Sequence, residues 1–517
     1  MKAEEKTGKV YLIGAGPGDP GLITVKGMEL INNCDAVVFD NLVPDELIVN
    51  LPPHSEKYYV GKRAGTHTLP QSEMNELLVR LAGEGKRVAR LKGSDPLIFG
   101  RGGEEAKYLK THGIKFEIVP GVTSGIAAPT YCGIPCTDRD KASLVTFVTG
   151  HKAQEKVLST VPWECIAKAK NGTVVIYMGV GEIANIVSEL TRYGMSPDSP
   201  MAVIERGTFP TQRHFTTTLT DMPDLVIREN IRPPALFVIG EVVRLQPFME
   251  WFGDGPLFGV RVMVTRPADQ SGEVYRALRD LGAEVLPYPT ISTRENIDDK
   301  GWESFSKISE ENNWLILTSE NGVRYFFRQF AERVGDIRQL GRFKIAAVGH
   351  GTARALEQVH LRADFIPKKA TTQALADELC GHVDLSGVNV VRIRGNLADD
   401  RIENKLVSAG ASVLPITCYH TSYTGWMDGF KERLFEHLPD IITFTSGSTA
   451  AGLCKILSGE EMEILTRDAQ IISIGPSTTD MIKSLGIKVT LEADEHSVPG
   501  IISKIVEYYT NKLQGVQ

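Results

Sequence analysis

Short apolar runs rich in β-branched residues alternate with longer amphipathic stretches along most of the chain. Runs this short predict strands, and the stretches between them predict helices. Regular alternation of the two is typical of layered α/β folds, so we expect α/β architecture throughout. In the first half the predicted strands are Val10–Ile13, Ala36–Phe39, Arg87–Leu91, Phe116–Val119, Leu144–Thr149 and Thr173–Tyr177.

The alternation stops at residues 246–258, where QPFMEWFGDGPLF follows neither the helical nor the strand period. Proline, glycine and aromatic residues dominate this stretch, as in many linkers. The pattern restarts with a strand at Val260–Thr265 and a helix from about Ser271 to Leu281, ended by Gly282. We therefore expect one folding unit at 1–245, a linker at 246–258 and a second unit at 259–517.

The second unit contains two similar stretches. Trp314–Ser319 (WLILTS) and Ile441–Ser446 (IITFTS) each end in a small hydroxylated turn, and each precedes a second strand with a small-residue turn, at 348–352 and 474–478. Two copies are too few for a solenoid. The pattern predicts an internal duplication that gives two similar α/β lobes.

Length and charge narrow the class of protein. The chain has 517 residues, 57 Lys+Arg and 64 Asp+Glu, so it is long enough for roughly three or four domains. A net charge of -7 does not favour nucleic acid as a partner. No apolar stretch approaches the length of about 18 residues that marks a membrane span, and the start lacks a signal-peptide core. We expect a cytoplasmic, non-membrane enzyme.

The seven cysteines are scattered, and only Cys132 and Cys136 lie close together. A zinc site would need a second pair of ligands, which the sequence lacks. We expect reduced thiols and no metal.

The loop Gly14–Gly21 (GAGPGDPG) follows a predicted strand. It is not a dinucleotide fingerprint, because Asp19 occupies the place of the last glycine. Pro17 and Pro20 also remove backbone donors that an anion would need. The loop favours close approach of the backbone to a neutral or cationic ligand, and a plain strand-to-helix turn is the alternative.

Further loops of this kind follow other predicted strands. RLKGSDPLIFGRGGEE at 90–105 is the most marked, and shorter ones lie at 120–124, 177–181 and 204–208. Open α/β sheets bind ligands at the carboxyl ends of their strands. The sequence therefore predicts a ligand site built from these loops.

Six motifs in order, GAGPGDPGLITVKG, RLKGSDPLIFGRGGEE, PGVTSGIAAP, GIPCTDRD, YMGVG and AVIERGTFPTQR, resemble uroporphyrinogen-III C-methyltransferases of the tetrapyrrole methylase family over residues 8–245. The resemblance implies lobes at about 8–120 and 121–245, with S-adenosylmethionine (SAM) between them and S-adenosylhomocysteine as product. It also implies a homodimer formed by this half. The SAM contacts that it implies are Pro17, Gly93, Ser94, Asp95, Ile98, Thr123, Ser124, Met178 and Gly207.

In that family a pyrrole carbon attacks the sulfonium methyl group, and the ring then loses a proton. Asp40 matches the proposed general base and Lys62 the proposed proton donor. The alternatives are a helix N-cap for Asp40 and a substrate carboxylate clamp for Lys62. Because the substrate carries eight carboxylates, we expect basic residues to act as counter-charges. The candidates are Arg63, Lys92, Arg101, Arg139 and Lys141.

Two residues depart from the family pattern. Ser94 stands where the family usually has glycine, which adds a hydroxyl near the expected methionine moiety of SAM. Asp138 stands where histidine is frequent, which puts a negative charge near a polyacidic substrate.

The second half has no metal cluster and no nucleophile motif, but it has hydroxylated turns at predicted strand ends. Such groups at helix starts either bind carboxylates or cap the helix, and both roles stay open. VRVMVTRPADQSGEVYRALRDLGAEVLPYPTI, TSENGVRYFF, RIRGNLADDRIENKLVSAGASVLPITCYHT, ITFTSGSTAAGL and IGPSTTDMIKSLGIKV resemble uroporphyrinogen-III synthases over about 258–513. That family closes linear hydroxymethylbilane to uroporphyrinogen III, with inversion of the last ring and loss of water.

The resemblance implies a two-stranded connector between lobe one, at about 259–294 plus 421–517, and an inserted lobe two, at about 295–420. Tyr419 matches the tyrosine proposed to help the hydroxyl leave, and simple packing is the alternative. The expected carboxylate contacts are Thr318, Ser319, Ser446, Ser477 and Thr478. The charges expected to face the cleft are Arg266, Arg392 and Arg394.

The two resemblances reinforce each other, because the product of the second half is the substrate of the first. We expect a bifunctional enzyme that converts hydroxymethylbilane to uroporphyrinogen III and then to precorrin-2, towards sirohaem or cobalamin. The alternative is a methyltransferase of a later corrin precursor, or of RNA, fused to a non-catalytic tetrapyrrole-binding module.

Overall fold

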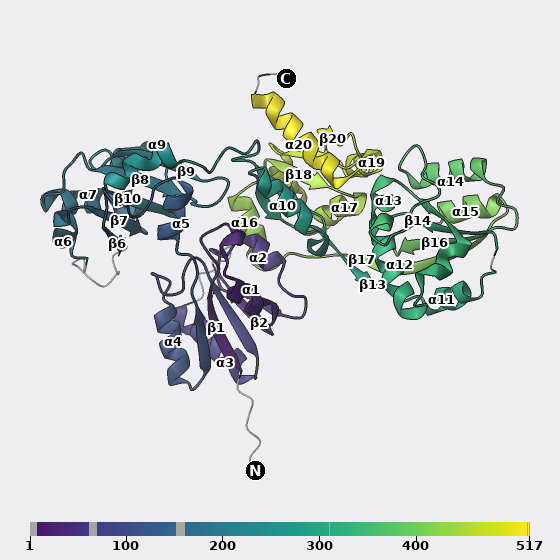
Figure 1. Ribbon diagram of the computed structural model, residues 1–517, viewed down its shortest axis with the longest axis horizontal. Helices are drawn as coiled ribbons and strands as arrows, with labels where there is room; N and C mark the ends of the chain where they lie inside the picture. Colours follow the sequence, from purple (N-terminus) through teal and green to yellow (C-terminus); the bar gives the residue numbers. More distant parts are fainter. Residues whose placement is uncertain (1–7, 62–69, 151–160, 310, 514, 516–517) are drawn as a thin grey trace, which may run out of the picture. The chain divides into compact units, whose positions relative to one another are not determined.

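The computed structural model of the chain describes residues 8–61, 70–150, 161–309, 311–513 and 515. Helices and strands alternate through these residues, which confirms the predicted α/β architecture (Figure 1). The described strands form four sheets of five strands each. The strands predicted in the first half all occur, because their apolar runs are short, β-branched and bounded by turn residues.

The first sheet is parallel, with the strand order β3-β2-β4-β1-β5. Strand β2 is buried along its whole length, as is usual when helices cover a parallel sheet. The strands are β1 Lys9–Gly14, β2 Ala36–Phe39, β3 Glu56–Tyr59, β4 Arg87–Lys92 and β5 Lys115–Val119. The helices are α1 Val25–Asn32, α2 Asp45–Val49, α3 Gln71–Gly83 and α4 Gly102–Thr111. Because the strands are parallel, the loops that follow them emerge at one edge of the sheet.

The second sheet is mixed, with the order β6-β7-β10-β8-β9 and only β6 and β7 parallel. Its strands are β6 Leu144–Thr149, β7 Gly172–Tyr177, β8 Pro200–Glu205, β9 Arg213–Thr218 and β10 Ala235–Ile239. The helices of this region are α5 Ser124–Tyr131, α6 Trp163–Lys168, α7 Ile183–Arg192, α8 Met222–Arg228 and α9 Gln246–Met249. Helix α9 occupies the start of residues 246–258, where the sequence pattern predicts neither helix nor strand.

The third sheet has the order β12-β11-β18-β19-β20 and the fourth β13-β17-β16-β14-β15. Their strands are β11 Arg261–Val264, β12 Glu284–Pro287, β13 Ile291–Glu295, β14 Asn313–Leu317, β15 Phe343–Ala347, β16 Asn389–Gly395, β17 Ser412–Tyr423, β18 Ile441–Phe444, β19 Gln470–Ser473 and β20 Leu491–Glu492. The helices are α10 Gly272–Asp280, α11 Asp299–Ser306, α12 Glu320–Arg333, α13 His350–Glu357, α14 Thr372–His382, α15 Arg401–Ser408, α16 Phe430–Glu436, α17 Gly447–Ile456, α18 Gly459–Thr466, α19 Pro476–Ser484 and α20 Val498–Leu513.

The repeat predicted in the second half is present as two parallel strand pairs, β14 with β15 and β18 with β19. A helix follows each of these strands after a small-residue turn. Strands β13 and β17 pair antiparallel, from Ile291 opposite Tyr423 to Glu295 opposite Tyr419, in the place where a two-stranded connector is expected.

The chain divides into two compact units that do not follow the sequence order. The first unit is Met1–Val262 together with Tyr275–Pro287 and Met427–Pro439. The second is Met263–Val274, Tyr288–Trp426 and Asp440–Gln517. Two segments from the second half of the sequence therefore belong to the same compact unit as the first half.

Candidate active sites

Three loops meet closely at the carboxyl edge of the first sheet. A Cβ atom added to Gly14 would lie 2.5 Å from the Cα of Gly121, and one added to Gly121 would lie 2.4 Å from the carbonyl oxygen of Ser94. The Ser94 amide donates to the Gly16 carbonyl at 2.6 Å, and the Ala15 amide donates to the Lys92 carbonyl at 2.8 Å. Glycine at these points lets the loops after β1, β4 and β5 form one continuous floor.

Asp95 links the loops after β4 and β5 through hydrogen bonds to backbone amides. Its Oδ1 accepts from the amides of Leu97 at 2.8 Å and Ile98 at 3.1 Å, and its Oδ2 accepts from the Gly121 amide at 3.0 Å. Both carboxylate oxygens are thus used to shape the loop after β4 and to tie it to the loop after β5.

The Ser94 hydroxyl serves helix α5. Its Oγ accepts from the Ser124 amide at 2.6 Å, at the first residue of that helix. The N-cap residue of the helix, Thr123, makes no side-chain cap of its own. The departure from glycine at position 94 therefore supplies a helix cap from another loop. Ser94 has a φ of 66°, a left-handed conformation that glycine adopts more easily.

Tyr177 sits behind the same helix start. Its hydroxyl lies 2.7 Å from Thr123 Oγ1 and accepts from the Gly125 amide at 2.8 Å. Its ring packs against Phe99 with a centroid distance of 4.9 Å. Burial raises the pKa of the Tyr177 phenol, so it stays protonated at neutral pH.

Strained backbone is concentrated in these loops. Ten non-glycine residues have a positive φ in the described parts of the chain, and six of them fall in the loops after β4, β7 and β8. Such conformations cost about 1–3 kcal/mol each and cluster at ligand sites. The six are Ser94, Phe99, Arg101, Met178, Arg206 and Thr208.

The loop after β1 also meets the loop after β8. The Asp19 amide donates to Thr208 Oγ1 at 3.0 Å, and the Tyr131 hydroxyl donates to Asp19 Oδ2 at 2.7 Å. A Cβ added to Gly207 would lie 2.3 Å from the Cβ of Ala128 on α5. Pro17 and Gly207, two of the residues expected to contact SAM, therefore flank the same contact.

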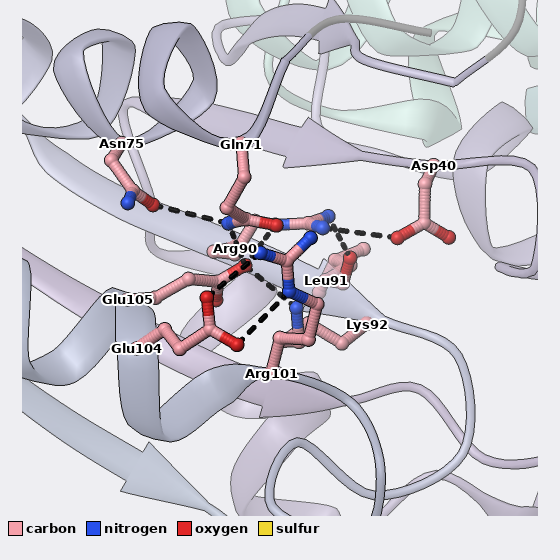
Figure 2. Close-up of polar contacts among 9 residues, drawn as sticks. All are labelled: Asp40, Gln71, Asn75, Arg90, Leu91, Lys92, Arg101, Glu104 and Glu105. Carbon is pink, nitrogen blue, oxygen red and sulfur yellow. Dashed lines mark hydrogen bonds and ion pairs between the residues drawn. The ribbon is translucent and has the colours of Figure 1, made fainter. Parts of the chain in front are cut away.

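Asp40 lies at the end of β2 and belongs to a chain of charges that leads into the sheet. Figure 2 shows Arg90 between Asp40 and Glu105. Arg90 Nη2 donates to Asp40 Oδ2 at 3.0 Å, and its Nε lies 3.6 Å from Glu105 Oε1. Lys92 Nζ lies 2.7 Å from the same Glu105 oxygen. Glu105 is fully buried, and Arg90 is 4% exposed, so these charges are held in fixed positions.

The alternative role of Asp40 as a helix N-cap is wrong. Helix α2 begins at Asp45 with Pro44 at its N-cap position, and Asp40 Oδ1 instead accepts from the Leu42 amide at 3.0 Å. The half-buried Asp40 carboxylate is thus fixed by one backbone amide and one guanidinium.

The expected counter-charges occupy different environments. Lys92 is 5% exposed, and burial lowers its pKa against the opposing effect of Glu105. Arg101 is exposed and pairs with Glu104 through two hydrogen bonds. Arg139 and Lys141 are exposed as well. This geometry favours Arg101, Arg139 and Lys141 over Lys92 for contact with a ligand, while Lys62 and Arg63 lie outside the described residues.

The Asp138 carboxylate accepts hydrogen bonds from backbone amides of its own loop. Its Oδ1 accepts from the amides of Asp140 at 2.9 Å and Lys141 at 3.0 Å. The carboxylate is thereby compensated locally, so it opposes a polyacidic ligand less than the sequence alone suggested.

A segment from the second half of the sequence holds the loop that follows Asp40. Arg433 on α16 donates to the carbonyls of Asn41 at 3.1 Å and Val43 at 2.6 Å, and it pairs with Asp45 at 2.8 Å. Arg279 on α10 pairs with Glu46 on α2. Burial raises the pKa of Glu46, and Arg279 opposes that shift.

In the second unit the structure brings Ser319 and Tyr419 together. Their hydroxyl oxygens are 3.0 Å apart, and Ser319 Oγ also accepts from the Gly322 amide as the N-cap of α12. The Tyr419 ring stacks on Tyr325 with a centroid distance of 5.5 Å and an interplanar angle of 18°. Burial raises the pKa of Tyr419, so its phenol is protonated and able to donate.

The three arginines expected to face the second cleft differ. Arg266 donates to Glu320 Oε2 at 2.7 Å, and Glu320 is the residue that follows Ser319. The expectation for Arg392 is wrong, because its residue is 2% exposed and it forms an internal ion pair with Glu403. Arg394 also pairs with Glu403, at 2.9 Å.

The remaining expected carboxylate contacts lie at helix starts. Thr318 is half-buried between β14 and α12, and Ser446 is the N-cap residue of α17. Ser446 Oγ lies 2.9 Å from Ser448 Oγ. In the first turn of α19, Ser477 is exposed and Thr478 is buried. The arrangement leaves amide and hydroxyl donors at the carboxyl ends of β14, β18 and β19.

Sequence reasoning missed Arg90, Tyr177, Tyr325 and Arg433. Tyr177 opens the YMGVG motif and Arg90 opens RLKGSDPLIFGRGGEE, so a signal existed for both. Tyr325 and Arg433 depend on partners distant in the sequence. Among the described residues no group of His, Cys, Asp or Glu is arranged to hold a metal ion. None of the helices described has the length and apolar character of a membrane crossing.

Two family models match the chain in succession. The model of Tetrapyrrole (Corrin/Porphyrin) Methylases matches residues 9–223, and that of Uroporphyrinogen-III synthase HemD matches residues 273–503. The porphyrin biosynthesis protein HemD of Ruminiclostridium josui is 37% identical over 503 residues, covering 97% of this chain and 98% of that protein. The chain belongs to the HemD porphyrin biosynthesis family. It is a fusion of a tetrapyrrole methylase domain with a uroporphyrinogen-III synthase domain, as the motifs predicted.

Other relatives of this HemD family member match its methylase half. The S-adenosyl-L-methionine-dependent uroporphyrinogen III methyltransferase of Methanosarcina barkeri is 48% identical over 242 residues, covering 47% of this chain and 94% of that protein. The crystal structure of native uroporphyrin III C-methyl transferase from Thermus thermophilus is 39% identical and has a TM-score of 0.40, covering 46% of this chain and 100% of that one.

Proposed function

We propose that the chain is a bifunctional enzyme of tetrapyrrole biosynthesis. Its second half cyclises hydroxymethylbilane to uroporphyrinogen III, and its first half methylates that product twice with SAM to give precorrin-2. The observation that carries the proposal is the presence of both family domains in one chain, because one supplies the other's substrate. We place the boundary between the two catalytic halves at residues 246–258.

The first site fits a ligand that lies close to the backbone. Beside the contacts of Gly14 and Gly207, a Cβ added to Gly93 would lie 2.5 Å from the Cβ of Leu42. Met178, in the loop after β7, is 53% exposed. The loops after β1 and β8 are joined by the hydrogen bond from the Asp19 amide to Thr208 Oγ1. SAM, when bound, supplies a methyl group on a sulfonium. We assign its contacts to Pro17, Gly93, Ser94, Asp95, Ile98, Thr123, Ser124, Met178 and Gly207.

The chain's own residues would then position the ring and accept its proton. Asp40 is the proposed proton acceptor. Arg90 donates to its Oδ2 and the Leu42 amide donates to its Oδ1, so the carboxylate is held in one orientation. Arg101 is placed to compensate substrate carboxylates. Most of the rate enhancement comes from holding the reacting carbon in line with the methyl group.

In the second site Tyr419 is the proposed donor to the departing hydroxyl. Its phenol is protonated and hydrogen-bonded to Ser319, which fixes its direction. Arg266 and the donors at Thr318, Ser319, Ser446, Ser477 and Thr478 would bind the substrate's carboxylates. The pyrrole nitrogen can expel the hydroxyl itself, so the larger task of this site is to hold the chain in the conformation that allows ring inversion.

The test is to incubate the purified chain anaerobically with hydroxymethylbilane, with and without SAM, then oxidise the products and separate them by isomer and methyl number. The type III isomer without SAM and a dimethylated product with SAM are expected. If only the spontaneously formed type I isomer appears, the synthase assignment is wrong and the second half is a binding module. We also propose a homodimer formed by the methyltransferase half, which light scattering would detect as a doubled mass.

A further inference from the structure

The first unit contains a cavity of about 450 Å³ beside the loop that follows β8. Its volume lies in the range of small-molecule sites. Most of its wall comes from β8, β9 and the turns beside them, and the rest comes from residues near β11 and α16. The lining residues that matter are Arg206, Thr211, Arg213, Arg232, Arg261 and His437.

Arg206 is a largely buried part of the cavity wall, held by three hydrogen bonds. Its Nε donates to Thr211 Oγ1 at 3.0 Å, its Nη1 donates to His437 Nε2 at 2.8 Å, and its Nη2 donates to Glu284 Oε1 at 2.6 Å. Arg261 shares Glu284 at 3.5 Å. One carboxylate thus faces two guanidinium groups, which leaves positive charge on this side of the cavity.

The lining as a whole is cationic. It has four arginines against Glu205 and Glu436, and Glu284, outside the lining, pairs with two of those arginines, so an excess of one positive charge remains. His437 adds none, because burial and the neighbouring Arg206 lower its pKa to about 4. In a chain with a net charge of -7, this concentration of arginine is a local exception.

Two of the lining arginines are exposed enough for a ligand to reach. Arg232 is exposed, and within the described residues its guanidinium has no ion pair or hydrogen bond. The side chain of Arg213 is 45% exposed although it pairs with Glu205. Guanidinium groups bind carboxylates through two parallel hydrogen bonds, so two exposed ones lining one cavity suit a ligand with at least two acidic groups.

We propose that this cavity, the arginine pocket, is a binding site for a small organic polycarboxylate. It is separate from the proposed SAM site, although one turn serves both. Gly207 and Thr208 contact α5 and the loop after β1, whereas Arg206 and Thr211 of the same turn line the arginine pocket. The ligand is either the polycarboxylic tetrapyrrole of the proposed function or a free di- or tricarboxylate.

The test measures binding calorimetrically to the full chain, without turnover, using three probes: uroporphyrin I, citrate and inorganic phosphate. Arg232→Glu is compared with Arg228→Glu, which reverses an exposed charge on α8 outside the pocket. Arg213→Gln is the second pocket variant, and circular dichroism checks that each variant folds. Loss of one charged bidentate contact is expected to weaken binding about tenfold or more.

A loss of uroporphyrin binding in both pocket variants and not in Arg228→Glu would support the proposal with a tetrapyrrole as ligand. The same loss for citrate alone would support it with a free carboxylate as ligand. Sensitivity to phosphate alone, or equal binding by all variants, would overturn it. None of these results depends on the two catalytic activities, which the product assay tests independently.

Discussion

Asp40 and Asp35 stand at opposite ends of the same strand and allow a matched test. Asp40 follows β2 in the proposed site, whereas Asp35 precedes β2 and pairs with Arg87 at the surface, which lowers the Asp35 pKa to about 2. We expect Asp40→Asn to lower the methyltransferase kcat about a hundredfold, because a positioned base is lost. Residual activity should remain, since the geometry of the site persists. Steady-state methylation assays check this, and a comparable fall in Asp35→Asn would contradict it.

Tyr419→Phe removes a hydroxyl whose described side-chain partner is Ser319 while keeping the ring stacked on Tyr325. We expect the rate of type III isomer formation to fall about tenfold, the scale of one lost proton donor. Tyr325→Phe is the control, because its hydroxyl donates to Thr293 on β13. Wild-type synthesis by Tyr419→Phe would assign Tyr419 to packing.

His437 makes stability depend on pH. Its folded pKa is about 4, whereas the unfolded chain takes up a proton near 6.5. The unfolded state therefore binds more protons between these values, and the free energy of unfolding falls as the pH drops from about 6.5 to about 4. After allowance for partial exposure we expect a loss of about 1–2 kcal/mol. Urea unfolding at several pH values should show that the free energy of unfolding falls less in His437→Gln than in the wild type. An equal dependence on pH in both proteins would contradict the assignment.

At the scale of single residues, the sequence predicted the positions of loops better than the exposure of the side chains in them. The glycines and Asp95 do form a tightly folded loop after β4, because its geometry depends on adjacent residues. Its role in binding SAM stays a prediction. Lys92 was expected to be a counter-charge for the substrate, yet it is buried and pairs with Glu105 on α4. Charge pairing of that kind depends on helix packing, which a local pattern does not contain.

At the scale of elements, helix α5 depends on a hydroxyl supplied by another loop. Ser94→Ala removes the acceptor for the Ser124 amide but keeps the unfavourable φ, so we expect a loss of about 1 kcal/mol. Ser94→Gly loses the same bond but relieves strain of about 1 kcal/mol. Chemical unfolding should therefore rank Ser94→Gly above Ser94→Ala, and the reverse order would contradict the cap.

Element positions in the sequence were predictable where the apolar period was clean, as for β2 and β6. Strand β16 shows where that reasoning stops. Arg392 and Arg394 lie on one face by alternation, but α15 covers that face and supplies Glu403 to both. A charged strand residue can be exposed or buried, and only the covering helix decides which.

At the scale of the whole molecule, Arg433 connects the second half of the sequence to the proposed methyltransferase site. It holds two carbonyls and one carboxylate of the loop after Asp40. We expect Arg433→Ala to lower the methyltransferase kcat/KM about tenfold by loosening that loop. Arg433→Lys should recover part of the loss because it retains the charge. Methylation of added uroporphyrinogen III measures the effect, and an unchanged kcat/KM would show that the loop does not need this contact.

The order of motifs was enough to predict the fusion, and the family matches confirm it. The composition of the compact units was not predictable. Segments Tyr275–Pro287 and Met427–Pro439 carry no motif of the first half, yet they belong to its unit. Such membership arises from contacts between residues hundreds of positions apart, which composition and periodicity do not record.

The contact between Arg433 and Val43 spans 390 residues of sequence. At roughly 5–20 residues per second, a ribosome needs about 20–80 s to travel that distance. The first sheet can therefore form early in synthesis, whereas the loop beside Asp40 lacks its contact with Arg433 until that residue has been translated. Until then the methyltransferase site would lack the support of this contact, so its full activity would arise only after much of the synthase half has been made.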